Sequence, residues 1–185
     1  MVFPNAKPND AHKYIAKLEE KKNVYVVTQN IDNLHEKAGS TNVVHLHGEL
    51  MKCCSENNPE DRTCWVELPQ EAFGESGLEI PFEQEAKDGS LLRPYIVFFE
   101  EPVPNYEKAA EEISDADILV VIGTSLQVYP AAGLIDVFDI DKPLVIIDPD
   151  KSIITRIVLP NKHTIHIDKG ASEGMKELMD IIDTL

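Results

Sequence analysis

The stretch VYVVTQNIDNLHEKAGSTNVVHLHGEL, residues Val24 to Leu50, decides the fold. The apolar run VYVV ends directly in TQN, and a second run, NVVHLHGEL, contains the pair His47-Gly48. An apolar run followed at once by polar residues is typical of a buried strand with polar groups at its carboxyl end, where ligands bind in open α/β sheets. The stretch therefore predicts two strands that share one site, and its polar candidates are Thr28, Gln29, Asn30, Asp32, His35, His45 and His47.

Composition narrows the class of protein before any motif is considered. The 33 acidic and 17 basic residues give a formal charge of −16, so nucleic acid and membrane surfaces are not expected partners. Three cysteines, an odd number, argue for a reducing compartment rather than a disulfide scaffold. No apolar run reaches the length of a membrane span and the amino terminus lacks a signal-peptide pattern, so the cytoplasm is the expected location.

Strands and helices are expected to alternate along most of the chain. A helix capped by Asn9 or Asp10 precedes VYVV, and a short helix ending at Gly39 follows it. This alternation predicts an α/β fold, a Rossmann-like parallel sheet with helices on both faces. The further strands are expected at 93–99, 118–123, 143–150 and 163–167, and the further helices at 104–113, 130–138 and 172–185.

Between the two halves of this pattern lies a segment without sustained periodicity. Residues 49–91 are acidic and punctuated by proline and glycine, and they are too long for a simple connection within a compact domain. The sequence therefore predicts a small loop-rich lobe at 49–91, inserted in a Rossmann-like domain made of residues 1–48 and 92–185.

Four motifs give the chain a resemblance to a known family. TQNIDNLHEKAG, HLHGEL, LRPYIVFFEE and DILVVIGTSLQVYPAAG occur in the order and approximate spacing of the sirtuins, and the likeness extends from Asn9 to the last helix. The resemblance implies an NAD-dependent protein lysine deacylase, which transfers the acyl group to ADP-ribose and releases nicotinamide. Acylated lysine in proteins or peptides is then the expected substrate, and NAD the expected cofactor.

The resemblance also implies roles for individual residues. His47 is implied as the general base, a task that suits an imidazole because its pKa lies near neutral pH. Asn30 is implied as a second catalytic residue, and with Gln29 and Asp32 it is expected to hold the nicotinamide ribose and carboxamide. The remaining cofactor residues implied are Gly123, Thr124, Ser125 and Asp148, and the residues implied to flank the substrate peptide are Val97, Phe98, Phe99, Val128 and Tyr129.

Each of these positions also has a structural interpretation. His35 and His45 are read as structural or surface histidines, and His47 without the family would be read in the same way. Asp32 alone is compatible with a helix cap, and Gly123 with a turn after a strand. Tyr129-Pro130 is equally compatible with the start of a helix. The functional interpretation depends on the joint pattern.

The chain departs from the family pattern in its glycines and cysteines. Its first glycine is Gly39, so the glycine-rich unit that cradles the NAD pyrophosphate in sirtuins is missing, and weak NAD binding and little or no turnover are expected of this chain. Zinc is not expected, because Cys53, Cys54 and Cys64 are three ligands where a structural site needs four.

Two further departures concern acids near the implied site. Glu100 stands where the substrate segment of the family has glycine, and Asp148 stands where an asparagine is common. Asp148 is still expected to accept hydrogen bonds from ribose hydroxyls. Two other functions remain open at this point, a non-enzymatic sirtuin-like binding protein and an NAD-dependent protein ADP-ribosyltransferase.

Overall fold

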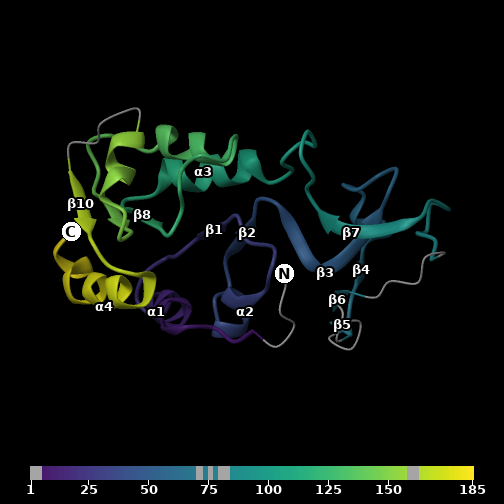
Figure 1. Ribbon diagram of the computed structural model, residues 1–185, viewed down its shortest axis with the longest axis horizontal. Coiled ribbons are helices and arrows are strands. Elements are labelled where there is room, and N and C mark those ends of the chain that lie inside the picture. Colours follow the sequence, from purple (N-terminus) through teal and green to yellow (C-terminus); the bar gives the residue numbers. More distant parts are fainter. Residues whose placement is uncertain (1–5, 70–72, 75–76, 79–83, 158–162) are drawn as a thin grey trace.

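The parallel sheets and helices expected from the sequence are present in the computed structural model, which describes residues 6–69, 73–74, 77–78, 84–157 and 163–185 (Figure 1). Strands β8 (Leu119–Ile122), β9 (Leu144–Ile147) and β10 (Thr164–Ile167) form a parallel sheet in the order β10-β9-β8. Strands β1 (Val26–Thr28) and β2 (Val43–His45) form a separate parallel pair. The expected parallel sheet is therefore divided into two parts.

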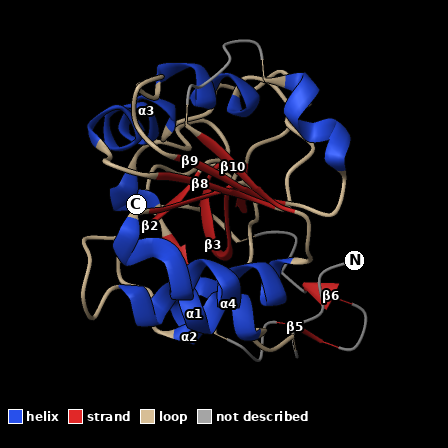
Figure 2. Ribbon diagram, turned by 90° about the vertical axis from the view of Figure 1, so that its left-hand side faces the viewer, coloured by secondary structure: helices blue, strands red, loops and turns tan. Residues whose placement is uncertain are grey.

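Helices cover both sides of these strands, as Figure 2 shows. Helices α1 (Asp10–Leu18), α2 (Leu34–Ala38) and α4 (Ala171–Ile181) lie on one side, and α3 (Tyr106–Asp115) lies on the other. The described residues also contain the helical turns η1 (Arg62–Cys64), η3 (Ala131–Val137), η4 (Lys151–Arg156) and η5 (Ile182–Thr184). None of the helices in the described ranges has the length and apolar content needed to cross a bilayer.

Strand β9 supplies both layers of the core because its side chains alternate between the two sides. Leu144 and Ile146 join the cluster under α3 and η3, whereas Val145 and Ile147 join the cluster under α1 and α4. All four are fully or almost fully buried. The cluster under α3 also contains Val44 and Leu46, so apolar packing connects the β1-β2 pair with the larger sheet.

The ends of the first two helices follow the sequence prediction. The side chain of Asn9 accepts a hydrogen bond from the backbone N–H of His12, and His12 bonds back to the backbone N–H of Asn9. Gly39 ends α2 in the left-handed region at φ 110°, a conformation that glycine adopts without steric cost.

The lobe has more regular structure than its sequence suggests. Strand β3 (Gly48–Ser55) pairs antiparallel with β7 (Leu92–Ile96) and with β4 (Val66–Glu67). A short hairpin, β5 (Phe73–Gly74) and β6 (Gly77–Leu78), follows, and residues 70–72, 75–76 and 79–83 of the predicted lobe lie outside the described residues. The expected strand at 93–99 is found at Leu92–Ile96, in this antiparallel sheet. The domain boundaries at residues 48 and 92 remain a prediction.

Candidate active site

His47 lies between β2 and β3 and is half-buried. Its Nδ1 is 3.1 Å from the carbonyl oxygen of Gln29, which follows β1. A carbonyl oxygen only accepts hydrogen bonds, so Nδ1 carries the proton and Nε2 of the neutral ring keeps its lone pair. Nε2 has no hydrogen-bond partner among the described residues, and it is therefore available to take up a proton.

The glycine after His47 is required by the backbone. Gly48 has φ 85°, and a Cβ atom added there would collide with the main-chain carbonyl of Tyr95 on β7. The carbonyl oxygen of His47 accepts a hydrogen bond of 3.0 Å from the N–H of Val97, just beyond β7. The position of His47 therefore depends on the close approach of β3 and β7.

A side-chain hydrogen bond connects the ends of β1 and β8. The amide Nε2 of Gln29 donates to Oγ1 of Thr124 over 3.2 Å, although the two residues lie 95 positions apart. Gly123 ends β8 at φ 58°, and a Cβ atom added there would meet nothing within 4 Å. The structure thus brings the predicted residues of TQNID and GTSLQ to the same edge, beside open space.

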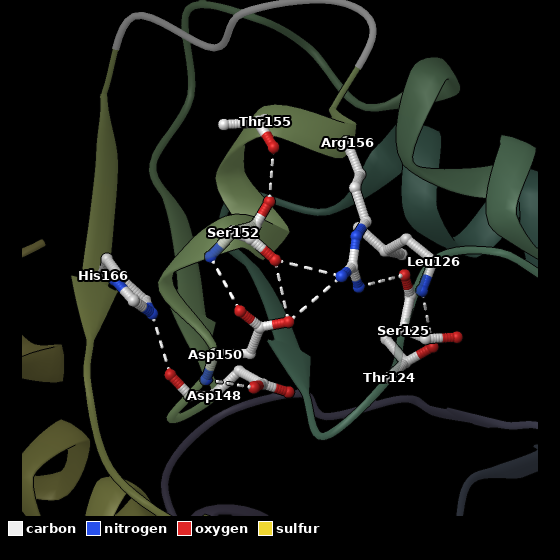
Figure 3. A network of polar contacts seen from close by, with 9 residues as sticks. All are labelled: Thr124, Ser125, Leu126, Asp148, Asp150, Ser152, Thr155, Arg156 and His166. Carbon is white, nitrogen blue, oxygen red and sulfur yellow. Dashed lines mark hydrogen bonds and ion pairs between the residues drawn. The ribbon is translucent and has the colours of Figure 1, made fainter.

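A polar network joins the end of β8 to the end of β9 (Figure 3). Arg156 donates from one guanidinium nitrogen to the Ser125 carbonyl oxygen over 3.1 Å, and from the other to Asp150 Oδ2 over 3.0 Å. Hydrogen bonds from Ser152 and the charge of Arg156 lower the pKa of the Asp150 carboxyl group. Arg156 and Asp150 were not predicted as site residues from the sequence. The one sequence feature that could have indicated Arg156 is a basic residue shortly after a predicted strand in an acidic chain.

Two predicted acidic residues have local roles that do not depend on a ligand. Asp32 Oδ1 accepts the backbone N–H of Leu34 over 3.0 Å, a local turn contact, whereas the cap position of α2 is Asn33, whose side chain makes no capping hydrogen bond. Asp148 Oδ1 accepts the N–H of Asp150 over 2.7 Å, and His166 Nε2 bonds to the Asp148 carbonyl oxygen. Each carboxylate retains a second oxygen, so neither contact excludes binding to a hydroxyl group.

The residues expected to flank a substrate peptide are exposed. The exposed fractions are 56% for Phe98, 98% for Phe99, 47% for Val128 and 69% for Tyr129, whereas Val97 is half-buried. Phe99 is the most exposed of the large apolar side chains in the described residues, so it is accessible to a ligand.

Glu101, three residues further along the chain, holds the segment at Phe98 in place. Glu101 accepts the N–H of Phe98 over 3.0 Å and pairs with Arg93 over 3.0 Å. Glu100, in contrast, makes no ion pair or hydrogen bond with a described residue, and its φ of 75° lies in the region that favours glycine. This geometry explains why glycine suits that position.

The three cysteines are buried and free. Burial raises the pKa of the Cys53 thiol to about 11 and also raises that of Cys54, so both side chains are protonated at neutral pH, whereas a zinc ligand is a thiolate. In the described part of the chain, no three His, Cys, Asp or Glu side chains are grouped so that they could hold a metal ion. The absence of zinc remains a prediction.

The fold is that of an α/β protein whose candidate site residues gather at the carboxyl ends of its parallel strands. Residues 1–130 match the model of the Sir2 family. An NAD-dependent protein deacylase of Bacteroides thetaiotaomicron is 46% identical over 177 residues, which are 95% of this chain and 71% of the relative. A relative of the same name from Helicobacter pylori is 43% identical and is matched over 69% of its length.

Solved structures agree with the sequence relatives. A Sir2 homologue in complex with NAD superposes with a TM-score of 0.76 at 34% identity, over 98% of this chain and 67% of that one. A Sir2 protein bound to acetylated peptide superposes with a TM-score of 0.73 at 32% identity, over 100% of this chain and 75% of that one. The chain belongs to the Sir2 family.

Proposed function

We propose that the chain is an NAD-dependent protein deacylase in which His47 is the general base. The observation that carries this proposal is the hydrogen bond between His47 Nδ1 and the Gln29 carbonyl oxygen, 3.1 Å long, because it sets the tautomer that leaves Nε2 free to accept a proton. Asn30 acts beside it. Its side-chain amide makes no hydrogen bond with a described residue and is therefore available to a ligand.

The residues at the strand ends fit the chemical groups of NAD. Gln29, Asn30 and Thr124 offer neutral donors and acceptors for ribose hydroxyls and an amide, and Asp32 and Asp148 offer acceptors. The open space at Gly123 lets the backbone of the Gly123–Ser125 segment approach a phosphate or ribose. When bound, NAD supplies the ribose carbon from which nicotinamide leaves. The protein orients the hydroxyl groups and removes a proton.

The proposed substrate is an acylated lysine in a protein or peptide. An extended peptide can pair through its main chain with Val97–Phe99 and with the segment at Val128 and Tyr129, while the exposed aromatic rings cover its side chains. Support comes from the relatives that were solved with an acetylated peptide or with a p53 peptide and NAD. Nucleic acid and membrane surfaces are not proposed as partners of a chain with a charge of −16.

Two coarser features complete the proposal. Residues 49–91 form a small lobe inserted in a Rossmann-like domain of residues 1–48 and 92–185, a division supported by the change from parallel to antiparallel pairing at β3. The cytoplasm is proposed as the location, supported by three cysteines without a disulfide.

The test is nicotinamide release from NAD with and without an acetylated peptide. His47→Ala should abolish peptide-dependent release, whereas His163→Ala, at an exposed histidine on another edge, should leave it unchanged. Measurable peptide-dependent turnover that His47→Ala leaves undiminished, in the chain or in a form with a restored glycine-rich unit, would refute the role of His47. Calorimetric titration with NAD separates a binding protein without chemistry from an enzyme, and transfer of labelled ADP-ribose to protein would indicate a transferase.

A further inference from the structure

His45 is a buried histidine with hydrogen bonds at both ring nitrogens. It ends β2 and is only 4% exposed. Nδ1 lies 3.0 Å from the Asn30 carbonyl oxygen, and Nε2 lies 2.8 Å from Glu36 Oε1 on α2. A carbonyl oxygen and a carboxylate both accept, so both ring nitrogens must donate. Only the imidazolium ion, with a proton on each nitrogen, satisfies this geometry.

The charges around His45 favour that ion. Burial by itself would lower the pKa of His45, but the hydrogen bond and charge of Glu36, the Asn30 carbonyl and the charge of Glu49 on β3 raise it overall. Burial likewise opposes ionisation of Glu36, but its hydrogen bond to His45 lowers the Glu36 pKa overall. His35 on α2 is a third neighbour, and its own pKa is lowered by burial and by His12 on α1, so it adds no lasting positive charge at neutral pH.

The group that His45 holds belongs to the turn that carries the proposed catalytic residues. Three consecutive carbonyl groups of this turn have donors from β2, from β3 and from His47 between them. The Gln29 carbonyl has His47 Nδ1, the Asn30 carbonyl has His45 Nδ1, and the Ile31 carbonyl has the Leu50 N–H over 2.8 Å. The first of these bonds sets the tautomer of His47. The second holds the next carbonyl of the same short turn, at Asn30.

We propose that His45 is a positioning residue, an imidazolium ion clamped between Glu36 and the Asn30 carbonyl that fixes the turn from which Asn30 and His47 act. The inference rests on the proposed function of that turn. His45 does not touch the reacting atoms, and its effect is transmitted through the main chain of Gln29 and Asn30. Glu36 shares the role because its carboxylate accepts the hydrogen bond from Nε2 and its charge stabilises the second proton on the ring.

Glu36→Gln is the deciding variant because it removes the carboxylate and keeps the shape, and Glu111→Gln on the exposed face of α3 is its matched control. Nitrogen NMR of the imidazole rings in the free chain should show His45 protonated on both nitrogens at neutral pH. In Glu36→Gln the ring should lose one proton at a lower pH than in the wild type. The backbone amide signals of Gln29, Asn30 and Ile31 should follow that titration.

Turnover gives the second readout. Glu36→Gln should lower kcat about 10-fold with less than about a 2-fold change in KM for NAD. Its kcat should also fall as the pH rises through the range in which its His45 deprotonates, while wild type and Glu111→Gln show no such fall there. A packing defect alone would not produce that pH dependence.

Three results would overturn the proposal: a neutral His45 ring in the wild type, amide signals of the turn that ignore its titration, or an unchanged kcat and pH profile in Glu36→Gln. If the wild-type chain shows no turnover with any peptide even when a glycine-rich unit is restored at its amino end, the proposed function fails. The NMR measurements then still decide whether His45 positions the turn.

Discussion

Gly48→Ala tests whether the close approach of β3 to β7 positions His47. Gly48 has φ 85°, and its added methyl group would collide with the Tyr95 carbonyl group. The left-handed conformation alone costs a residue with a side chain about 1–2 kcal/mol. The collision is with main chain, which moves only if the pairing of Gly48 with Ile96 is disturbed, and forced overpacking of this kind costs roughly a further 1–3 kcal/mol. The expected loss in the free energy of unfolding is about 2–5 kcal/mol.

The chain offers a matched control at Gly89. It lies in the same lobe at φ 80°, but a Cβ atom added there would meet nothing within 4 Å. Gly89→Ala should therefore lose only the conformational part, about 1–2 kcal/mol. The difference between the two variants isolates the contact with Tyr95.

Urea unfolding followed by tryptophan fluorescence is the assay. Trp65 is the single tryptophan, and its ring packs on Tyr95 with centroids 4.3 Å apart, so it reports on this part of the lobe. With a slope of about 2 kcal/mol per M, Gly48→Ala should lower the urea midpoint by roughly 1–2.5 M, and Gly89→Ala by roughly 0.5–1 M. Nicotinamide release without urea should fail in Gly48→Ala only. Equal midpoints in the two variants would refute the steric argument.

Three other predictions concern single residues: Asp88, Arg156 and Glu100. The carboxyl group of Asp88 has its pKa lowered below its ordinary value of 3.8 by hydrogen bonds from Ser55 and its neighbours, so it stabilises the lobe above that pH and the contribution is lost as the pH falls. When the free energy of unfolding is measured at a series of pH values, Asp88→Asn should therefore lose less stability than wild type as the pH is lowered. Arg156→Met should weaken NAD binding about 10-fold by releasing the Ser125 carbonyl, as calorimetry would measure, and unaltered affinity would contradict this. Glu100→Gly should raise the free energy of unfolding, measured by thermal denaturation, by roughly 0.5–1 kcal/mol because glycine adopts a positive φ without strain, whereas Glu100→Gln should not raise it.

Local signals predicted much of the fold. Asn9 at the start of a helix and Gly39 at the end of another act through their immediate neighbours, and both were found where expected. Buried parallel strands are recognised in the sequence as apolar runs, as at Leu144–Ile147. The first strand begins at Val26 rather than Val24, since Tyr25 in that run is 41% exposed.

Strand β3 was missed because its residues do not alternate. The register with β7 shifts between Glu49 and Cys53, so the buried positions fall in an irregular order and Cys53, Cys54 and Ser55 are all buried in succession. A β-bulge removes the period of two on which strand recognition depends. An irregular register of this kind is set by the partner strand, more than 35 residues away, and leaves no local trace.

The candidate site shows the same limit. Motif resemblance selected His47, Gln29 and Thr124, and the structure brings them into one hydrogen-bonded series. It did not select Arg156, and it assigned His45 a structural or surface role. Each of these two side chains has one partner that is a main-chain carbonyl group distant in sequence, which any residue type supplies.

The two halves of the site are joined by side chains and packing rather than by a continuous ladder. In the described ranges β1 pairs only with β2 and β8 only with β9, and all four residues of β8 are half-buried whereas those of β9 are buried. The Gln29–Thr124 hydrogen bond and the apolar cluster around Ile146 cross between the sheets. Since one hydrogen bond contributes only about 1 kcal/mol, the distance from His47 to Ser125 depends chiefly on that cluster. Side chains in the core under α3 therefore set the distance between the two halves of the site.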